Sequence, residues 1–130
     1  MPNAPTAPAG HPYSCPDLRK EFGLSARTLR YYGAIELLPA FRRGEARFYS
    51  AADRARLREI LRLKKFGFTL QEIRELLILD EQHDAPGYAA RFERAAAAHL
   101  AAMRDRLAEL QHVIPALEAE RAANARRDAA

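Results

Sequence analysis

Apolar residues recur at helical spacing along several short stretches, and each stretch begins with a residue suited to a helix start. Ser14 is followed by a proline and, three residues later, by Asp17, while Ser25 precedes the stretch that contains Leu29. A serine hydroxyl accepts a hydrogen bond from a free amide of the first helical turn, so both serines predict N-caps. Only Gly23 to Ser25 separate the two predicted helices, an arrangement typical of a helix-turn-helix unit.

The stretch from Phe41 to Tyr49 has a different pattern, in which Gly44 and Glu45 separate two short runs of arginines and aromatic residues. Turn residues between two such runs predict a small β-hairpin. Ser50 and Thr69 then predict the starts of a third and a fourth helix. The expected buried positions of these helices are Leu57, Ile60, Leu61 and Leu63 in the third and Leu70, Ile73, Leu76 and Leu77 in the fourth.

From about Pro86 onward, apolar residues alternate in steps of three and four, as in the heptad repeat of a coiled coil. The stripe comprises Leu100, Met103, Leu107, Leu110, Ile114 and Leu117. A single helix cannot bury such a stripe, so we expect two chains to pair through it as a homodimer. Pro115 lies inside the stripe and removes one helical hydrogen bond, which predicts that the coiled coil ends or bends near Ile114. Residues 116–130 would then form a short second helix or a frayed end.

These patterns predict a mainly helical fold in which one modest domain is followed by one long helix. Residues 1–12 contain four of the eight prolines and no apolar run, so we expect a disordered tail that is not a signal peptide. Residues 13–80 carry the four predicted helices and the hairpin, and residues 81–130 a linker and the coiled-coil helix. No run approaches the length of about 18 apolar residues that a membrane span needs, so we expect no membrane as a partner.

Charge is distributed unevenly along the 130 residues, whose formal net charge is +4. Residues 1–68 hold 13 basic and 6 acidic side chains, a balance of +7, whereas residues 69–130 hold 8 and 11, a balance of −3. A basic domain followed by an acidic helix is typical of a polyanion-binding domain. The single cysteine, Cys15, excludes an intramolecular disulfide and favours a reducing cytoplasm. We interpret Cys15 as a small buried residue rather than a redox or metal site.

The sequence offers little for catalysis. The four histidines lack the spacing of a helical metal pair, and neither a glycine-rich phosphate loop nor a nucleophile elbow occurs. Asp80, Glu81, His83 and Asp84 form an acidic cluster with one imidazole, which we interpret as a solvated linker rather than a metal site. We therefore expect a binding protein and not an enzyme, and we identify no cofactor.

Basic side chains cluster on three consecutive predicted elements. Arg27 and Arg30 lie one turn apart on the second helix, where Tyr31 follows with a phenol that can donate to a phosphate. The hairpin and the end of the third helix add Arg42, Arg43, Arg47, Arg62, Lys64 and Lys65. Three basic patches beside a helix-turn-helix unit can follow the backbone of one duplex, so double-stranded DNA is the expected partner.

The motifs TLRYY, LLP, RFYS and GFTLQEIRELL, in this order between Leu24 and Leu77, resemble the DNA-binding domain of the MerR family of bacterial transcription regulators. With the preceding YSCPDLRKEFG the resemblance covers about half of the chain. It implies a winged helix-turn-helix domain and a C-terminal helix that pairs antiparallel with that of a second subunit. The stretch from Arg42 to Leu77 most resembles regulators of branched-chain amino acid and acyl-CoA catabolism.

The resemblance also implies how DNA is bound. The second helix would meet the major groove, the hairpin would contact the backbone as a first wing, and residues 64–68 would open a second wing. The homodimer would bind an inverted repeat in a promoter and distort it so that RNA polymerase engages both promoter elements. The expected DNA contacts are Arg27, Thr28, Arg30, Tyr31, Arg42, Arg43, Arg47, Tyr49, Lys64 and Lys65.

Three positions depart from the usual pattern of the family. Gly33 and Glu36 stand where the family usually has a glutamate and a glycine, and Ala46 replaces an aromatic residue of the wing. Glu36 thus occupies a helix end that favours a residue able to adopt the left-handed conformation. The C-terminal helix starts without the cysteines of metal-sensing members, so the effector stays open, as does the choice between activator and repressor.

Two other functional classes remain open at this point. An architectural DNA-binding protein, such as a nucleoid or recombination accessory factor, would use the same domain without promoter specificity. A helical protein-interaction adaptor would carry the same basic patches and bind no nucleic acid.

Overall fold

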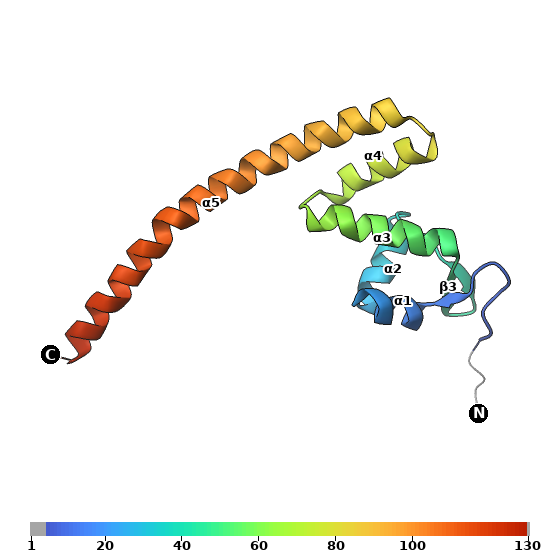
Figure 1. Ribbon diagram of the computed structural model, residues 1–130. Helices are drawn as coiled ribbons and strands as arrows, with labels where there is room; N and C mark the ends of the chain where they lie inside the picture. Colours follow the sequence, from blue (N-terminus) through green and yellow to red (C-terminus); the bar gives the residue numbers. More distant parts are fainter. Residues whose placement is uncertain (1–4, 130) are drawn as a thin grey trace. The chain divides into compact units, whose positions relative to one another are not determined.

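The computed structural model describes residues 5–129, and residues 1–4 and 130 lie outside the described part. Within that part, three short strands and five helices follow one another in the order β1, α1, α2, β2, β3, α3, α4 and α5 (Figure 1). The chain divides into two compact units, of which the first ends at Arg74 and the second begins at Glu75. The predicted mainly helical class with a small hairpin is confirmed.

The first helix, α1 (Cys15–Phe22), has the predicted ends because local side chains cap it. The hydroxyl of Ser14 accepts the amide of Asp17 at 3.1 Å, and the Asp17 carboxylate accepts the amide of Ser14 at 2.9 Å. Hydrogen bonds with Ser14 lower the pKa of Asp17, and the one from the Ser14 backbone amide has the larger effect. Gly23 ends the helix with a φ of 68°, in the left-handed region that glycine adopts without steric cost.

The second helix, α2 (Ala26–Ala34), follows directly and is amphipathic. Ser25 caps it as predicted, because its hydroxyl accepts the amide of Thr28 at 3.0 Å. Leu29 and Tyr32 are buried on one side of the helix, which leaves the other side to solvent.

The three strands form an antiparallel sheet in the order β1-β3-β2. β2 (Phe41–Arg43) and β3 (Ala46–Tyr49) are the predicted hairpin, in which Arg42 lies opposite Arg47. β1 (Tyr13–Ser14) was not predicted, because two residues carry no periodicity and their partner strand is more than 30 residues away in the sequence. Its pairing with β3 ties the start of α1 to the hairpin.

The third helix, α3 (Ala51–Lys65), begins at Ser50 in a capping box with Asp53, as predicted. Three of its four expected core positions are fully buried and Leu61 is half-buried. The fully buried large side chains before residue 74 include Leu18, Leu29, Leu37, Leu38, Tyr49, Leu57, Ile60, Leu63 and Ile73. The core of the first unit is thus made by residues of its helices, of β3 and of the segment after α2.

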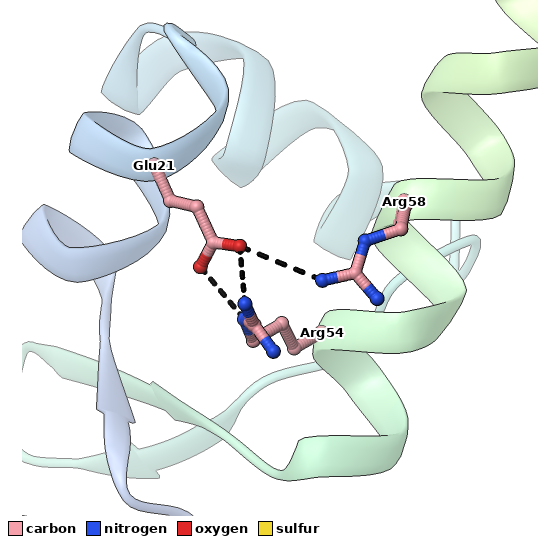
Figure 2. A network of polar contacts seen from close by, with 3 residues as sticks. All are labelled: Glu21, Arg54 and Arg58. Carbon is pink, nitrogen blue, oxygen red and sulfur yellow. Dashed lines mark hydrogen bonds and ion pairs between the residues drawn. The ribbon is translucent and has the colours of Figure 1, made fainter.

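Glu21 on α1 joins that helix to α3 through two arginines (Figure 2). Arg54 donates from Nε and Nη2 to the two carboxylate oxygens at 2.7 and 2.6 Å, and Nη2 of Arg58 lies 3.6 Å from one of them. The hydrogen bonds from Arg54 lower the pKa of Glu21. The Arg54 guanidinium also lies 5.4 Å from the ring centroid of Tyr13, so one cluster fastens β1, α1 and α3 to one another.

The fourth helix, α4 (Leu70–Glu81), begins with the predicted capping box. The Thr69 amide donates to Glu72 Oε1 at 2.9 Å, and the Glu72 amide donates to Thr69 Oγ1 at 3.1 Å. Its buried residues include the expected Ile73, Leu76 and Leu77, and Leu70 is half-buried.

The fifth helix, α5 (Ala85–Ala129), is continuous over 45 residues (Figure 1). Pro115 does not end it, so the expected separation of residues 116–130 from the helix is wrong for the described residues. A proline removes the amide of one hydrogen bond, while the bonds on either side and the strong helix formers around it hold the helix. None of the helices in residues 5–129 is long and apolar enough to span a membrane.

The N-terminal arm, which we define as residues 5–12, lies in the region expected to be disordered; residues 1–4 of that region are outside the described part. The arm forms no helix or strand, yet it contacts the hairpin. Nη1 of Arg43 donates to the Thr6 carbonyl at 2.8 Å, and the ring of His11 lies 5.0 Å from that of Phe41. Pro8 is buried. The composition of the arm did not predict these contacts.

Candidate nucleic-acid interface

The solvent side of α2 carries the basic and aromatic residues expected to meet DNA. Arg27 and Arg30 are exposed, and the side chain of Tyr31 is 51% exposed. Thr28 is half-buried and its hydroxyl lies 2.9 Å from that of Ser25, so it belongs to the helix cap. The start of α2 is therefore capped, and its exposed side presents two guanidinium groups and a phenol.

The hairpin of β2 and β3, the first wing, sorts its arginines by the alternation of a strand. Arg42 lies opposite Arg47 and Arg43 lies opposite Ala46 across the register. Cross-strand partners share a face of the sheet, so Arg42 and Arg47 lie on one face and Arg43 on the other. Gly44 makes the turn between the strands with a φ of 63°.

Two clefts bring α2 and the first wing together, and Arg30 and Arg47 line both. The one richer in arginine has a volume of about 300 Å³ and is lined by Arg30, Arg42, Arg47, Gly44 and Glu45. A guanidinium carries five donors and a permanent charge, and its planar fork matches the oxygens of a phosphate. Three of them around one cleft form a site for a polyanion, with the single carboxylate of Glu45 at its border.

Gly33 leaves room for Arg47 to reach α2. A Cβ atom at this position would lie 2.9 Å from Nη1 of Arg47 and 3.7 Å from the carbonyl oxygen of Leu38. The first separation is too short for a real contact, so a larger residue would displace the guanidinium. The departure from the family pattern at residue 33 therefore has a local consequence, which is the close approach of the wing arginine to α2.

The end of α2 is held in a strained conformation. Glu36 has a φ of 59°, in the left-handed region that costs a side-chain-bearing residue about 1 kcal/mol. The sequence-based expectation that this position favours a left-handed residue is thus confirmed. Two arginines stabilise the surrounding backbone, because Arg74 donates to the carbonyl of Ile35 and Arg56 donates to that of Leu37 at 2.8 Å.

The assignment of Tyr49 to the DNA contacts is wrong. Its side chain is 0% exposed, and its hydroxyl has no hydrogen-bond partner among the described residues. Burial raises the pKa of Tyr49 to about 12. β3 is the central strand of the sheet, and Phe48 and Tyr49 are both buried at its end. An alternating pattern assigns one of these two residues to solvent, whereas the tertiary structure covers both.

The remaining expected contacts are not gathered at the cleft. Arg43 is exposed and donates to the N-terminal arm. Lys64 and Lys65 are exposed at the end of α3, where Phe68 is buried and Phe66 is exposed. The structure thus unites Arg30, Arg42 and Arg47 and leaves Arg27, Tyr31, Lys64 and Lys65 as separate exposed positions.

The acidic cluster between α4 and α5 serves the helix ends. The Asp84 carboxylate accepts the amide of Gly87 at 2.9 Å at the start of α5, and His83 adopts a φ of 55° after the end of α4. No group of three or more His, Cys, Asp or Glu side chains is placed to hold a metal ion within residues 5–129. Cys15 is half-buried at the start of α1.

Two family profiles match the chain. Residues 13–80 match the MerR HTH family regulatory protein profile, and residues 54–119 match that described as MerR, DNA binding. The chain belongs to the MerR family. The resemblance inferred from its motifs is confirmed, whereas the branch that controls amino acid and acyl-CoA catabolism stays a prediction.

MerR-type regulators are similar to this chain over less than half of its length. The HTH-type transcriptional activator mta of Bacillus subtilis (strain 168) is 49% identical over 57 residues, which are 42% of this chain and 22% of the relative. The HTH-type transcriptional regulator HmrR of Rhizobium leguminosarum bv. viciae is 41% identical over 63 residues, 48% of this chain and 49% of the relative. The chain thus spans at most about half the length of these relatives.

Solved MerR-family structures share the fold. MtaN, the N-terminus of the Bacillus subtilis multidrug transporter activator, has a TM-score of 0.58 at 33% identity, covering 79% of this chain and 94% of MtaN. HiNmlR, a MerR family regulator lacking the sensor domain and bound to promoter DNA, has a TM-score of 0.58 at 25% identity, covering 85% and 87%. The fold of this chain is therefore that of a MerR DNA-binding domain with its C-terminal helix.

Proposed function

We propose that this protein is a transcription regulator that binds promoter DNA as a homodimer. The observation that carries the proposal is the cleft of Arg30, Arg42 and Arg47 between α2 and the first wing, in a chain of the MerR family. The HiNmlR complex supports the same role, because a relative of the same fold binds promoter DNA.

The charges define what each element does on DNA. Arg27 and Tyr31 on the exposed side of α2 enter the major groove, where arginine and tyrosine donate to base edges and phosphates. The cleft holds a backbone phosphate against the groove-facing helix, because its three guanidinium groups come from both elements. Lys64 and Lys65 at the end of α3 add sequence-independent phosphate contacts.

A second copy of the chain covers the apolar stripe of α5. Its six residues are between 37% and 60% exposed in the single chain, far more than a core position. The spacing along the stripe is 3, 4, 3, 4 and 3 residues and reads the same in both directions. Two antiparallel copies therefore match every apolar position, with Leu100 opposite Leu117 of the partner subunit and Leu107 opposite Leu110 of the partner subunit.

Disulfide trapping tests this register. In a Cys15→Ser background, the pair Leu100→Cys and Leu117→Cys is expected to form a covalent dimer on mild oxidation. The matched control, Leu100→Cys alone, is expected to run as a monomer on a denaturing gel without reducing agent. Antiparallel pairing separates the two copies of residue 100 by 17 residues, or about 25 Å. Efficient crosslinking of the single variant would indicate a parallel dimer and contradict the register.

The test of the whole proposal is selection of genomic fragments with the purified protein, followed by footprinting at two salt concentrations. One compact footprint over an inverted repeat is the expected result, with a preference of about 10³-fold or more over random DNA. Enrichment without a motif would instead indicate an architectural protein. No binding at either salt concentration would favour a protein-interaction adaptor that binds no nucleic acid.

Arg30→Ala is the decisive variant for the interface. Removing a guanidinium from the cleft is expected to weaken specific binding at fixed salt by roughly 5- to 100-fold. Arg94→Ala, which removes an exposed arginine of α5, is the matched control of equal charge and is expected to bind like the unmodified protein. Equal affinities of the two variants would contradict the interface.

Three finer parts of the proposal extend the family resemblance. The bound promoter is distorted so that RNA polymerase engages both of its elements, which in vitro transcription on the footprinted promoter tests. The protein acts in the cytoplasm, in keeping with its single cysteine. Control of amino acid or acyl-CoA catabolic genes remains a prediction that the genes beside the footprint check.

A further inference from the structure

The N-terminal arm is a part of the chain that the family match does not contain. The match begins at residue 13, and the arm of residues 5–12 precedes it. The arm nevertheless lies against the first wing, which is one side of the DNA-binding cleft. Its effect on the wing is therefore a property of this chain.

Two contacts fasten the arm to β2, and one hydrogen bond lies within the arm itself. Nη1 of Arg43 donates to the Thr6 carbonyl at 2.8 Å, and Pro5, Ala7 and Pro12 line a cleft that Arg30 and Arg47 also line. The ring of His11 lies 5.0 Å from that of Phe41, and the amide of His11 donates to the carbonyl of Pro8 at 3.1 Å. Pro8 itself is buried. The arm thus turns back on itself and touches both ends of β2.

The wing needs such support because it has little of its own. All three residues of β2 are exposed, as are Gly44 and Glu45 at the turn. β2 is an edge strand of the sheet, so only its β3 side is paired with another strand. The three prolines of the arm restrict its own freedom in the unfolded chain, so fixing the arm on the wing loses less entropy than fixing a flexible segment would.

The chemistry of the arm indicates that it acts through the wing and not on DNA directly. It contains no lysine or arginine, so it has no permanent charge with which to neutralise a phosphate. Arg43 stays exposed while one of its nitrogens is engaged, and a guanidinium has further donors for a phosphate oxygen.

We propose that the N-terminal arm braces the first wing in its DNA-binding conformation, by fixing Arg43 and Phe41. The brace rests on the proposed function, because it acts on the affinity for the promoter site. Without the arm, the wing makes the same contacts but must be ordered when DNA binds. The entropy of immobilising one long side chain corresponds to a factor of about 2 to 10 in Kd.

The test compares the full chain with a variant that lacks residues 2–10, on the footprinted site over a series of salt concentrations. This deletion keeps β1, the Ser14 cap and α1, so the domain retains its local folding signals. Two full-length variants, His11→Ala and Pro8→Gly, loosen the arm without shortening the chain. Thermal unfolding of each variant and hydrogen exchange of the wing amides accompany the titrations.

The deletion is expected to lower the affinity for DNA by about 2- to 10-fold for each wing, and the two point variants are expected to lower it less. The amides of Arg43 and Ala46 are expected to exchange faster in all three variants. The slope of log K against log salt is expected to stay the same, because no phosphate contact is removed. A merely structural role would lower the thermal stability and leave the affinity of the folded protein intact.

Other results overturn the brace. Tighter binding with a slope steeper by about 0.9 per subunit would mean that the arm competes with a phosphate for Arg43. A shallower slope would mean that the arm itself contacts the backbone, and unchanged affinity together with unchanged thermal stability would mean that it has no role. In each of these cases, loss of binding by Arg30→Ala in the full chain keeps the proposed function separate from the brace.

Discussion

Replacing Tyr49 by phenylalanine removes a single oxygen from the core of the first unit. That hydroxyl is buried and lacks a hydrogen-bond partner among the described residues. It therefore loses its hydrogen bonds to water on folding and gains none within the protein. A buried polar group without a partner costs about 1–3 kcal/mol, and the small void left by the oxygen offsets part of the gain. Tyr49→Phe is therefore expected to raise the free energy of unfolding at pH 7 by about 1 kcal/mol.

The same residue predicts how stability changes in alkaline solution. Burial raises the pKa of Tyr49 from 10.0 to about 12 in the folded state. Both states are protonated below pH 10, so this residue confers no pH dependence there. Above pH 10 the unfolded chain loses its proton first, and stability falls by about 1.4 kcal/mol per pH unit until the folded pKa is reached. The total loss is about 3 kcal/mol, and it is absent from the phenylalanine variant.

The assay is urea unfolding of both proteins at one fixed protein concentration, because dimerisation makes the midpoint concentration-dependent. The difference between the two proteins isolates Tyr49, since Tyr32, whose pKa burial also raises, contributes equally to both. DNA affinity at fixed salt is expected to be unchanged. A variant that is less stable at pH 7 and binds DNA more weakly would refute the reasoning, because the hydroxyl would then make a contact of its own.

Three further changes test other parts of the fold. Gly33→Ala is expected to stabilise α2 by up to about 1 kcal/mol in urea unfolding and to weaken DNA binding several-fold, because the new Cβ displaces Arg47; a gain in both would show that Arg47 does not need that place. Glu21→Gln is expected to flatten the acid limb of the stability curve. The lowered pKa of Glu21 stabilises the folded state above about pH 4.5, and this contribution is lost as the pH falls through the folded pKa. The stabilities of the two proteins, followed by circular dichroism in an acid titration, should therefore converge at low pH. Ser50→Ala removes the acceptor of the Asp53 amide and should lower the free energy of unfolding by about 1 kcal/mol, whereas Ser50→Asp, which keeps an acceptor, should restore most of it.

The sequence by itself determined the features that depend on neighbours a few residues away. The caps at Ser14, Ser25 and Ser50 and the left-handed end at Gly23 follow from side chains within three residues. The stripe of α5 follows from its own period. The assignment to the MerR family could also be made from the sequence, because the family's motifs are short stretches of sequence in a fixed order. Short-range hydrogen bonds and periodicity need no knowledge of the fold, so these predictions held.

Tertiary structure alone decided which of the basic and aromatic residues share a surface. Tyr49 looks like a wing residue in the sequence, yet it is fully buried in a strand that pairs with β1, where Tyr13 lies opposite it. Arg42 and Arg43 are neighbours in the chain, but the pleat of β2 directs one to the cleft and the other to Thr6 of the arm. Such pairings join residues that are about 30 to 40 positions apart, and a local pattern carries no information about which distant segment covers it.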